Sequence, residues 1–211
     1  SHIAVEKLYR DAQIKTCATF EDTFKQAYND PAYKIVIPIE NSLAGRVADI
    51  HYLLPKYKLQ IHGEYFLPVV HNLLGKPDAT INDIKYVRSH AQAISQCQKI
   101  IANKNFQPII SVDTAGSAKD LAEGKDKTIA AIASDLSAKM YNLKILQKNI
   151  EDDKGNVTRF LIMGKNIEQP DYDKSKKYIT SCIFRVKSEP SALYKCLGGF
   201  ATNRVNLTKL E

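Results

Sequence analysis

The chain has 211 residues, of which 44% are apolar and 25% charged, and its formal net charge is +7. This composition is typical of a soluble globular protein with one good-sized domain, or with one domain and a fragment of another. It excludes a membrane protein with helical spans, because the longest apolar runs, such as 35–39 and 129–133, are far too short to cross a bilayer.

The cysteines argue against a metal centre or a disulfide framework. Cys17, Cys97, Cys182 and Cys196 are scattered, with no CxxC pair and no clustered histidines, so reduced thiols in a cytoplasmic protein are expected. No glycine-rich nucleotide loop or His-Glu-x-x-His motif occurs, so no cofactor and no metal are expected. The lysines are spread along the chain and no RNA-binding strand signature occurs, so no nucleic-acid partner is expected. A modest positive field would also steer a small anionic substrate, and the charge alone does not decide between these partners.

Short β-type runs alternate with helical patterns, which predicts βαβ units and mixed, mostly parallel sheets in an α/β fold. Thr19 and Asp22 form a capping-box pattern at the start of one helix, and Ser89 with Gln92 forms another. Further helices are expected over 3–10, 47–54, 115–123 and 135–141. Strands are expected over 15–19, 34–39, 59–74, 84–87, 106–112, 128–133, 143–150 and 158–164.

The composition changes after Gly164. Residues 166–177 are polar and charged and include Pro170, which predicts a linker. A strand over 177–187, a helix over 191–203 and a strand over 205–210 then form a βαβ fragment. Such a fragment is too small to bury a core alone, so we expect a second domain or partner contacts to complete it.

Polar clusters follow four predicted strands at their carboxyl ends, where ligands bind in open α/β sheets and where helix N-termini favour anions. The clusters are Glu40-Asn41-Ser42, Ser89-His90-Ala91-Gln92, Asp113-Thr114-Ala115-Gly116-Ser117 and Ser134-Asp135. Any one of them taken alone is better explained by helix capping without a ligand. Four in parallel favour a site for a small carboxylate.

Residues 156–160, Asn-Val-Thr-Arg-Phe, lead into an apolar run and strengthen that reading. Arg159 offers a planar fork that fits a carboxylate through two hydrogen bonds. Thr158 and Arg159 are neighbours, so in an extended strand they project to opposite faces unless a bulge re-aims one. Histidine is a residue type suited to acid–base catalysis, but His90 is explained equally well as a surface residue at a helix start.

The ordered set of motifs resembles prephenate dehydratase, and the resemblance covers essentially all of residues 1–164. The matching stretches are Ile37-Pro38-Ile39-Glu40-Asn41-Ser42-x-x-Gly45, Ser89-His90-x-Gln92, Asp113-Thr114-Ala115, Ala130-Ala131-Ile132-Ala133-Ser134 and Asn156-x-Thr158-Arg159-Phe160. The resemblance implies a catalytic region over 1–165 that is similar to a two-lobed, type II periplasmic binding protein. Lobe one would hold about 1–68 and 150–165, and lobe two about 69–149.

Residues 178–211 resemble the start of an ACT regulatory domain, which has an α+β, ferredoxin-like fold. The resemblance implies an effector site for phenylalanine at Ser191, Ala192, Leu193 and Glu211, and a homodimer or homotetramer. By the same resemblance, the family's first strand and its Gly-x-Tyr-Ser turn are expected before Ser1, and more than half of the ACT domain is expected after Glu211.

The implied reaction converts prephenate to phenylpyruvate, carbon dioxide and water. Thr158 would donate a hydrogen bond to the leaving hydroxyl, with His90 or water as the proton source. Arg159 would bind the pyruvyl carboxylate. The ring carboxylate loses its charge as it leaves, so tight pairing would slow the step and neutral donors are expected there. Those donors would be Ser89, Thr114 or the Ala115 and Gly116 amides.

Other predicted substrate-binding residues are Asn41, Ser42, Gln92, Ser134 and Asn156, while Phe160 is expected to pack behind the site. Two alternatives stay open at this point. Arogenate dehydratase would accept an amino group where prephenate has a keto group. A non-catalytic two-lobed binder for a small carboxylate would use the same residues, but Thr158→Val would leave its affinity unchanged.

Overall fold

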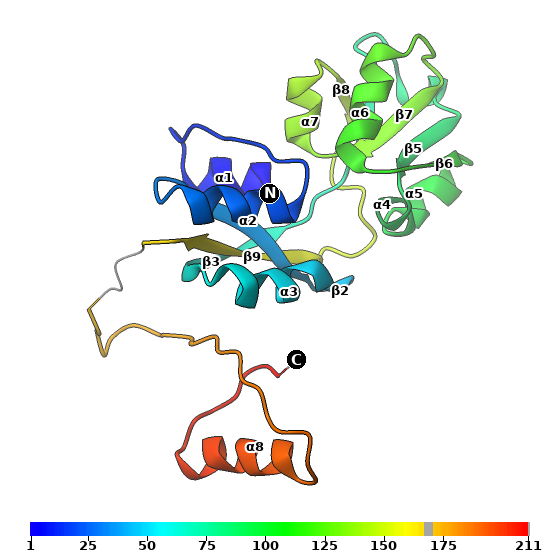
Figure 1. The fold of residues 1–211 in the computed structure, drawn as a ribbon. Helices are drawn as coiled ribbons and strands as arrows, with labels where there is room; N and C mark the ends of the chain where they lie inside the picture. The colour runs from blue at the N-terminus through cyan, green and yellow to red at the C-terminus, as the bar shows by residue number, and fades with distance from the viewer. Residues whose placement is uncertain (167–170, 211) are drawn as a thin grey trace. The chain divides into compact units, whose positions relative to one another are not determined.

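The computed structural model describes residues 1–166 and 171–210. Its contacts divide the chain into two compact units, Ser1–Gln169 and Pro170–Glu211, each described here by itself (Figure 1). The first unit holds two sheets with the strand orders β2-β1-β9-β3 and β6-β5-β7-β4-β8. We call the first sheet with its helices lobe one, and the second sheet with its helices lobe two.

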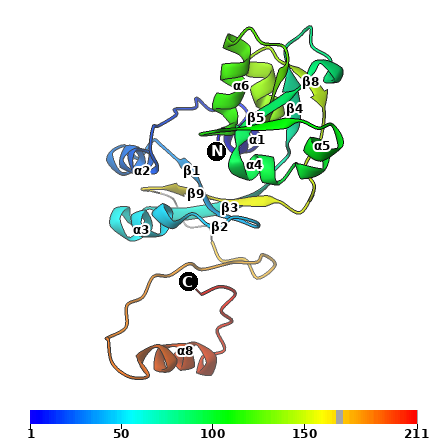
Figure 2. The same cartoon turned by 90° about the vertical axis from the view of Figure 1, so that its right-hand side faces the viewer.

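Lobe one is built from segments far apart in the sequence. Its strands are β1 (Ile35–Asn41), β2 (Gly45–Arg46), β3 (Gln60–Pro68) and β9 (Val157–Gly164), and its helices are α1 (His2–Leu8), α2 (Phe20–Asn29) and α3 (Ala48–Tyr57). Figure 2 shows β9 lying between β1 and β3. The central strand of this lobe is therefore the last of its strands in the sequence.

Both faces of β9 are buried, which explains its unbroken apolar run from Phe160 to Met163. Phe160 and Ile162 pack with Ala4 of α1 on one face. Leu161 and Met163 pack on the other face with Phe24 of α2 and with residues of α3. The alternation of β9 therefore assigns each of its side chains to one of two distinct cores.

Lobe two is continuous in sequence. Its strands are β4 (Asn72–Gly75), β5 (Tyr86–His90), β6 (Gln107–Ser111), β7 (Ile129–Ala133) and β8 (Lys144–Gln147). Its helices are the 3-10 turn Ile81–Asp83, α4 (Ala91–Ser95), α5 (Gln98–Asn103), α6 (Thr114–Glu123) and α7 (Asp135–Met140). Apolar side chains of α4, α5, β5 and β7 form its main core, with fully buried Val87, Cys97 and Ile132 among them.

The second sheet is mixed, as expected, but the ladders of the first sheet are all antiparallel among the described residues, so the prediction of mostly parallel sheets is wrong. In the described part of the chain, parallel ladders join β5 only to β6 and to β7. β4 is antiparallel to β7 and β8, and β9 is antiparallel to β1 and β3. The reason lies in the connectivity, because β9 re-enters lobe one after the excursion through lobe two and runs opposite to both of its neighbours.

Local signals succeeded where a side chain had its partner nearby. Thr19 caps α2 as predicted, and its hydroxyl oxygen accepts a 3.0 Å hydrogen bond from the Asp22 backbone N–H. The strand predicted over 15–19 is wrong, because that segment has no strand beside it and Lys15 instead donates to the Gln26 side chain. The Ser89 cap is also wrong, since Ser89 lies inside β5 and His90 caps α4.

The second unit contains one helix among its described residues, α8 (Ala192–Thr202), close to the prediction. The strands predicted over 177–187 and 205–210 are not formed there. Strands need hydrogen-bonded neighbours, and this short unit supplies none. No residue of α8 is buried, although the Phe184 and Phe200 rings lie 5.9 Å apart.

Across residues 1–166 and 171–210, no helix combines the length and apolar character needed to span a bilayer.

We expect the thiol of Cys97 to be unreactive in the folded protein. Cys97 is fully buried, and burial, reinforced by the nearby Asp152 and Glu151 carboxylates, raises the pKa of its thiol to about 12. At pH 8, iodoacetamide should therefore modify the exposed Cys182 and leave Cys97 unmodified. Peptide mass spectrometry checks this, with guanidinium-unfolded protein as the control in which both residues react. Equal labelling of the two in folded protein would contradict the packing.

Candidate active site

A bulge in β1 determines which of its residues lie opposite the polar residues at the start of β9. The register shifts between Pro38 and Glu40, after which Glu40 lies opposite Arg159 and Asn41 opposite Thr158. Directly opposed residues share a face of a sheet. Asn41 and Thr158 therefore share one face, while Glu40 and Arg159 share the other. Thr158 lies on the face of Phe160, and Arg159 on the face of Leu161.

Asn41 fixes the hydrogen bonding of the Thr158 hydroxyl. The Asn41 carbonyl oxygen accepts hydrogen bonds from two backbone N–H groups, those of Leu43 at 3.0 Å and Ala44 at 2.9 Å. Its NH₂ group must then face the other way, where Nδ2 lies 3.0 Å from Thr158 Oγ1. Thr158 thus accepts a hydrogen bond from Asn41, and its own O–H remains available to donate.

The same NH₂ group links Thr158 to a longer chain of amides. Asn41 Nδ2 donates to Asn156 Oδ1 at 2.6 Å, and Asn156 Nδ2 donates to Gln96 Oε1 at 2.7 Å. Gln96 Oε1 also lies 3.0 Å from His71 Nε2. Asn156 is 2% exposed and His71 7% exposed, while Asn41 and Gln96 are partly buried. The chain of hydrogen bonds crosses from Asn41 and Asn156 of lobe one to Gln96 and His71 of lobe two.

Ser42 holds the entry to β9 in place. Its hydroxyl donates to the Gly155 carbonyl at 3.0 Å and accepts from the Val157 backbone N–H at 2.9 Å. The Ser42 backbone N–H also donates to the Val157 carbonyl. These bonds fix the backbone immediately before Thr158, which keeps its hydroxyl in one position.

Arg159 is already paired with carboxylates. Its Nη2 and Nε each lie 2.7 Å from Glu64 Oε2, and its Nη1 lies 3.9 Å from Glu40 Oε2. The guanidinium carbon is 5.9 Å from the centre of the Phe66 ring, within the range of a cation–π contact. A substrate carboxylate would have to compete with Glu64 for this arginine.

Most of the predicted site residues of lobe two make hydrogen bonds that cap helices or lie within the sheet. Ser89 is fully buried and donates to the Ile132 carbonyl at 2.7 Å. His90 Nδ1 accepts from the Gln92 backbone N–H, and Gly116 N–H donates to Asp113 Oδ1 at 2.6 Å. Ser134 accepts from the Ser137 N–H. Thr114 and Ala115 form the first turn of α6. None of these contacts joins the chain that ends at Thr158.

The structure therefore brings together Asn41, Ser42, Asn156 and Thr158, and it leaves His90 and the α6 turn outside that group. Sequence analysis did not identify Gln96 or His71. Neither residue lies in a strand-to-helix turn or a capping pattern, and each acquires its role only because the lobes meet. In the sequence, neither Gln96, which precedes Cys97, nor His71, which precedes Asn72, belongs to a motif that indicates a site.

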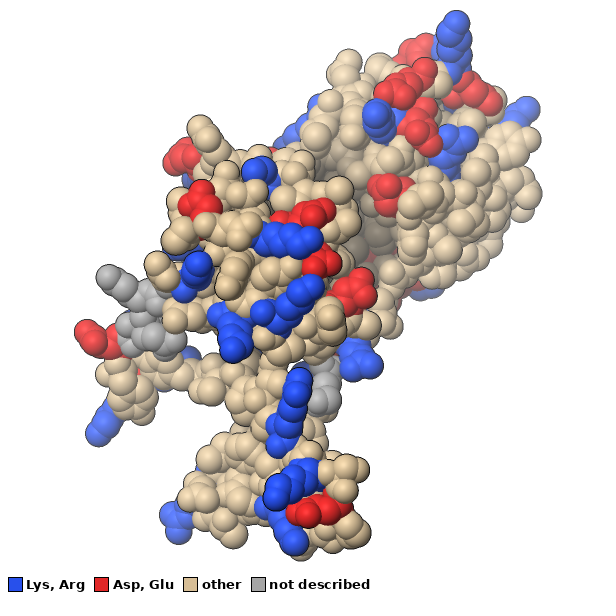
Figure 3. Space-filling model, viewed as in Figure 1, with Lys and Arg blue, Asp and Glu red and all other residues tan. Residues whose placement is uncertain are grey.

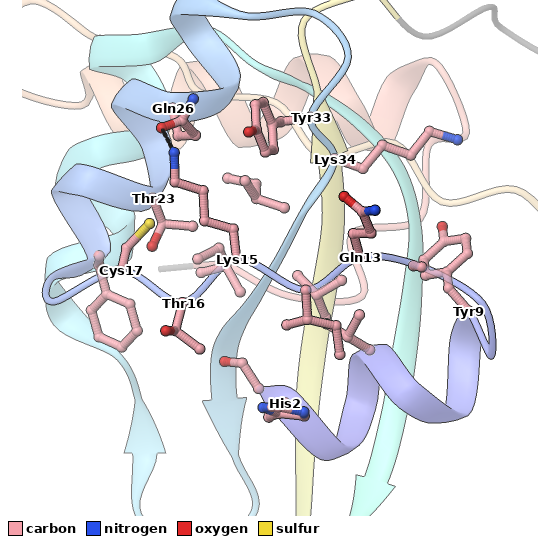
Figure 4. Close-up of a pocket in the computed structure, with 18 of the residues that line it drawn as sticks. His2, Tyr9, Gln13, Lys15, Thr16, Cys17, Thr23, Gln26, Tyr33 and Lys34 are labelled. Atoms are coloured by element: carbon pink, nitrogen blue, oxygen red, sulfur yellow. Dashed lines mark hydrogen bonds between the residues drawn. The ribbon is translucent and has the colours of Figure 1, made fainter.

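A cavity of about 870 Å³ lies elsewhere in lobe one, between α1, α2, residues 12–19 and the start of β1 (Figure 4). Lys15 reaches across it to Gln26 and lies 5.3 Å from the centre of the Tyr33 ring. Among its described lining residues there is no predicted catalytic or substrate-binding residue. The cavity and the Thr158 site are therefore separate features of the lobe.

The net positive charge is not concentrated in one patch on the face drawn in Figure 3, where basic and acidic side chains are interspersed. On the face that this view shows, the described basic side chains do not form the continuous stripe that nucleic-acid-binding surfaces carry.

Comparison with known proteins gives a consistent result. Residues 1–168 match the family described as Prephenate dehydratase. A bifunctional N-acyl-homoserine lactone acylase/prephenate dehydratase of Komagataeibacter europaeus is 41% identical over 198 residues, covering 92% of this chain and 69% of that protein. Arogenate dehydratase/prephenate dehydratase 1 of Arabidopsis thaliana, a chloroplastic protein, is 38% identical, covering 100% of this chain and 53% of its own length.

A solved structure of similar fold is the prephenate dehydratase of Arthrobacter aurescens in complex with L-Phe. It superimposes with a TM-score of 0.84 and 25% sequence identity, covering 100% of this chain and 71% of that one. The chain thus spans about half the length of the plant relative and about 70% of the length of the two bacterial proteins.

Two α/β lobes, joined by a chain of amide side chains that ends at a threonine hydroxyl, define a two-lobed α/β protein with a polar site at Thr158. The sequence match over residues 1–168 identifies which one: the chain belongs to the prephenate dehydratase family.

Proposed function

We propose that the protein is a prephenate dehydratase, a carbon–oxygen lyase that converts prephenate to phenylpyruvate in phenylalanine biosynthesis. The observation that carries this proposal is the Thr158 hydroxyl, which accepts from Asn41 Nδ2 and keeps its proton for a ligand. In the described part of the chain, no protein acceptor takes that proton. A donor held in this way suits a reaction whose leaving group is a hydroxyl.

The chemistry balances without an oxidant or a reductant. The bond between the ring and its carboxylate breaks, carbon dioxide leaves, and the electron pair enters the ring. The bond to the ring hydroxyl breaks at the same time, and hydroxide takes up one proton to become water. Thr158 donates a hydrogen bond to the departing oxygen. Because an alcohol is a very weak acid, we propose that water supplies the proton that is finally transferred, with His90 as the alternative source.

The two substrate carboxylates need different partners. Arg159 is proposed to bind the pyruvyl carboxylate, which keeps its charge. Because Arg159 lies on the opposite face of β9 from Thr158, its side chain must release Glu64 and turn toward the Thr158 face to reach the same substrate. The ring carboxylate would meet neutral donors, and the first-turn amides of Thr114 and Ala115 suit this role. Ser89 is less suitable because its hydroxyl donates to the Ile132 carbonyl. Gly116 is less suitable because its backbone N–H donates to Asp113 Oδ1.

Glu64→Gln tests the proposed exchange at Arg159. Removing the competing charge should lower KM for prephenate by up to about fivefold with kcat nearly unchanged, since a half-exposed ion pair is worth roughly 1 kcal/mol or less. Steady-state kinetics at low salt measures this. Glu123→Gln, at an exposed pair with Lys119, serves as the matched control and should change neither constant. A raised KM in Glu64→Gln would mean that the carboxylate supports the arginine and does not compete for it.

The activity itself is tested by phenylpyruvate formation from prephenate, with EDTA present and no cofactor added. Turnover supports a metal-independent dehydratase. No turnover with folded protein and stable prephenate would favour arogenate as the substrate, which the printed name of the plant relative includes. Binding of either compound without turnover would favour the non-catalytic two-lobed binder.

Several finer features are also part of the proposal. The catalytic region is proposed to span 1–165, with 166–177 as a linker and 178–211 as the start of an ACT domain. Phenylalanine is proposed as the effector, supported by the bound L-Phe in the Arthrobacter aurescens structure. Ser191, Ala192 and Leu193 would contact it, and Glu211 lies outside the described residues. Ser191 is the N-cap of α8 and has a left-handed φ of 65°. A cytoplasmic homodimer or homotetramer completes the proposal.

A further inference from the structure

The orientation of each side-chain amide in the chain from Asn41 to Gln96 can be assigned by starting at Asn41. A backbone N–H can only donate, so the Leu43 and Ala44 amides require the oxygen of Asn41 to face them. The NH₂ group of Asn41 then requires the oxygen of Asn156, and the NH₂ group of Asn156 requires the oxygen of Gln96. Each assignment fixes the next, so no amide in the chain can be flipped alone.

The last member of this chain is His71. Its Nε2 lies 3.0 Å from Gln96 Oε1, which is an acceptor in the orientation just derived. An imidazole nitrogen facing an acceptor must carry its hydrogen, so His71 is protonated at Nε2. Gln96 Oε1 therefore accepts two hydrogen bonds, one from Asn156 and one from His71.

His71 is held rigidly where the first connection enters lobe two. Its backbone N–H donates to Glu151 Oε2 at 2.9 Å, and its carbonyl accepts from the Ile150 N–H at 2.9 Å. Residues 150 and 151 belong to the second connection, the one that returns to β9. The imidazole is thus anchored at the point where both connections lie side by side, and it is 7% exposed.

We propose that His71 is a positioning residue for the Thr158 hydroxyl. It acts through Gln96, Asn156 and Asn41, and it contacts no reacting atom itself. By supplying the second donor to Gln96 Oε1, the Nε2–H group keeps that oxygen aimed at Asn156 and stops the glutamine amide from rotating. The orientation then passes along the chain to Asn41 Nδ2, which occupies the acceptor side of Thr158. This proposal rests on the proposed dehydratase activity for its kinetic consequence only.

The kinetic test compares two substitutions of similar bulk. His71→Phe keeps a ring but removes the donor, whereas His71→Gln retains an NH₂ donor at about the position of Nε2. We expect His71→Phe to lower kcat roughly five- to tenfold, the effect of losing one hydrogen bond, with KM changed less than about twofold. His71→Gln should recover most of kcat. His62→Phe, at an exposed histidine of β3, is the matched control and should behave as the unsubstituted protein.

A second measurement needs no substrate and therefore separates this proposal from the proposed function. The ¹⁵N chemical shifts of the His71 ring at pH 8 should show a protonated Nε2 and an unprotonated Nδ1. An Nδ1–H tautomer would overturn the proposal even in an active enzyme. Equal kcat in His71→Phe and His71→Gln would overturn it as well. A protein with the expected tautomer but no turnover of prephenate would refute the proposed activity and leave the hydrogen-bond direction intact.

Discussion

Replacing Thr158 by valine should lower kcat for prephenate by roughly 10²–10⁴-fold, the usual contribution of a positioned proton donor. Valine has nearly the shape of threonine and suits a strand, so the fold should survive with a loss of about 1 kcal/mol from the hydrogen bond to Asn41. KM should change little, because the hydroxyl acts on a bond that weakens mainly in the transition state. Steady-state kinetics and guanidinium unfolding together check both parts.

Two further variants make the result interpretable. Thr158→Ser keeps the hydroxyl and should recover kcat to within about tenfold, since only the methyl group that fixes the rotamer is lost. Thr180→Val makes the same substitution at an exposed site of the second unit and should have no effect. If Thr158→Val bound prephenate and kept more than a tenth of the unsubstituted kcat, the hydroxyl would not be the donor and the assignment would have to be abandoned.

Replacing Asn156 by leucine should have the largest effect on stability among the site variants. Asn156 is 2% exposed and makes one hydrogen bond at each end, to Asn41 and to Gln96. Leucine fills the same space without either bond, so we expect the free energy of unfolding to fall by about 2–3 kcal/mol. Asn41 keeps its hydrogen bonds with Thr158, Leu43 and Ala44, and Gln96 Oε1 keeps the one from His71, which limits the loss.

The same substitution breaks the chain of amide hydrogen bonds between Asn41 and Gln96, so kcat should fall at least tenfold even where the protein remains folded. Urea unfolding monitored by circular dichroism measures the stability, and kinetics below the transition measures the activity. Asn103→Leu, at the exposed end of α5, is the matched control and should lie within about 0.5 kcal/mol of the unsubstituted protein. A stable Asn156→Leu protein with normal kcat would show that the amide chain has no part in holding Thr158.

Sequence reasoning was most accurate where the determining contact is local. The Thr19 cap depends on Asp22 three residues away, and the opposite projection of Thr158 and Arg159 depends only on strand geometry. The partner of Arg159 could not be predicted, because Glu64 meets it only through the register between β3 and β9. The role of Ser89 could not be predicted for the same reason, because its hydroxyl donates to the Ile132 carbonyl of β7 and does not cap a helix.

The amide chain was beyond prediction for the same reason. Gln96 and Asn156 are separated by 60 positions, and their contact depends on how two sheets come together. The parallel-sheet expectation failed because alternating strand and helix patterns do not reveal that a chain leaves one sheet and later returns to it. What could be predicted was the presence of polar residues at strand ends. Which of them cooperate was decided by the tertiary structure.

The return of the chain to lobe one also constrains the order of events during synthesis. β1 and β3 do not pair with each other, because β9 lies between them. The sheet of lobe one therefore cannot be completed until β9, which ends at Gly164, has left the ribosome. Lobe two, from Asn72 to Gln147, is complete earlier and requires no later segment for its sheet. While lobe two is being synthesised, the edges of β1 and β3 that will pair with β9 therefore have no partner strand. Thr158, the proposed hydrogen-bond donor, lies on β9, so the proposed site can form only after the sheet of lobe two has been synthesised.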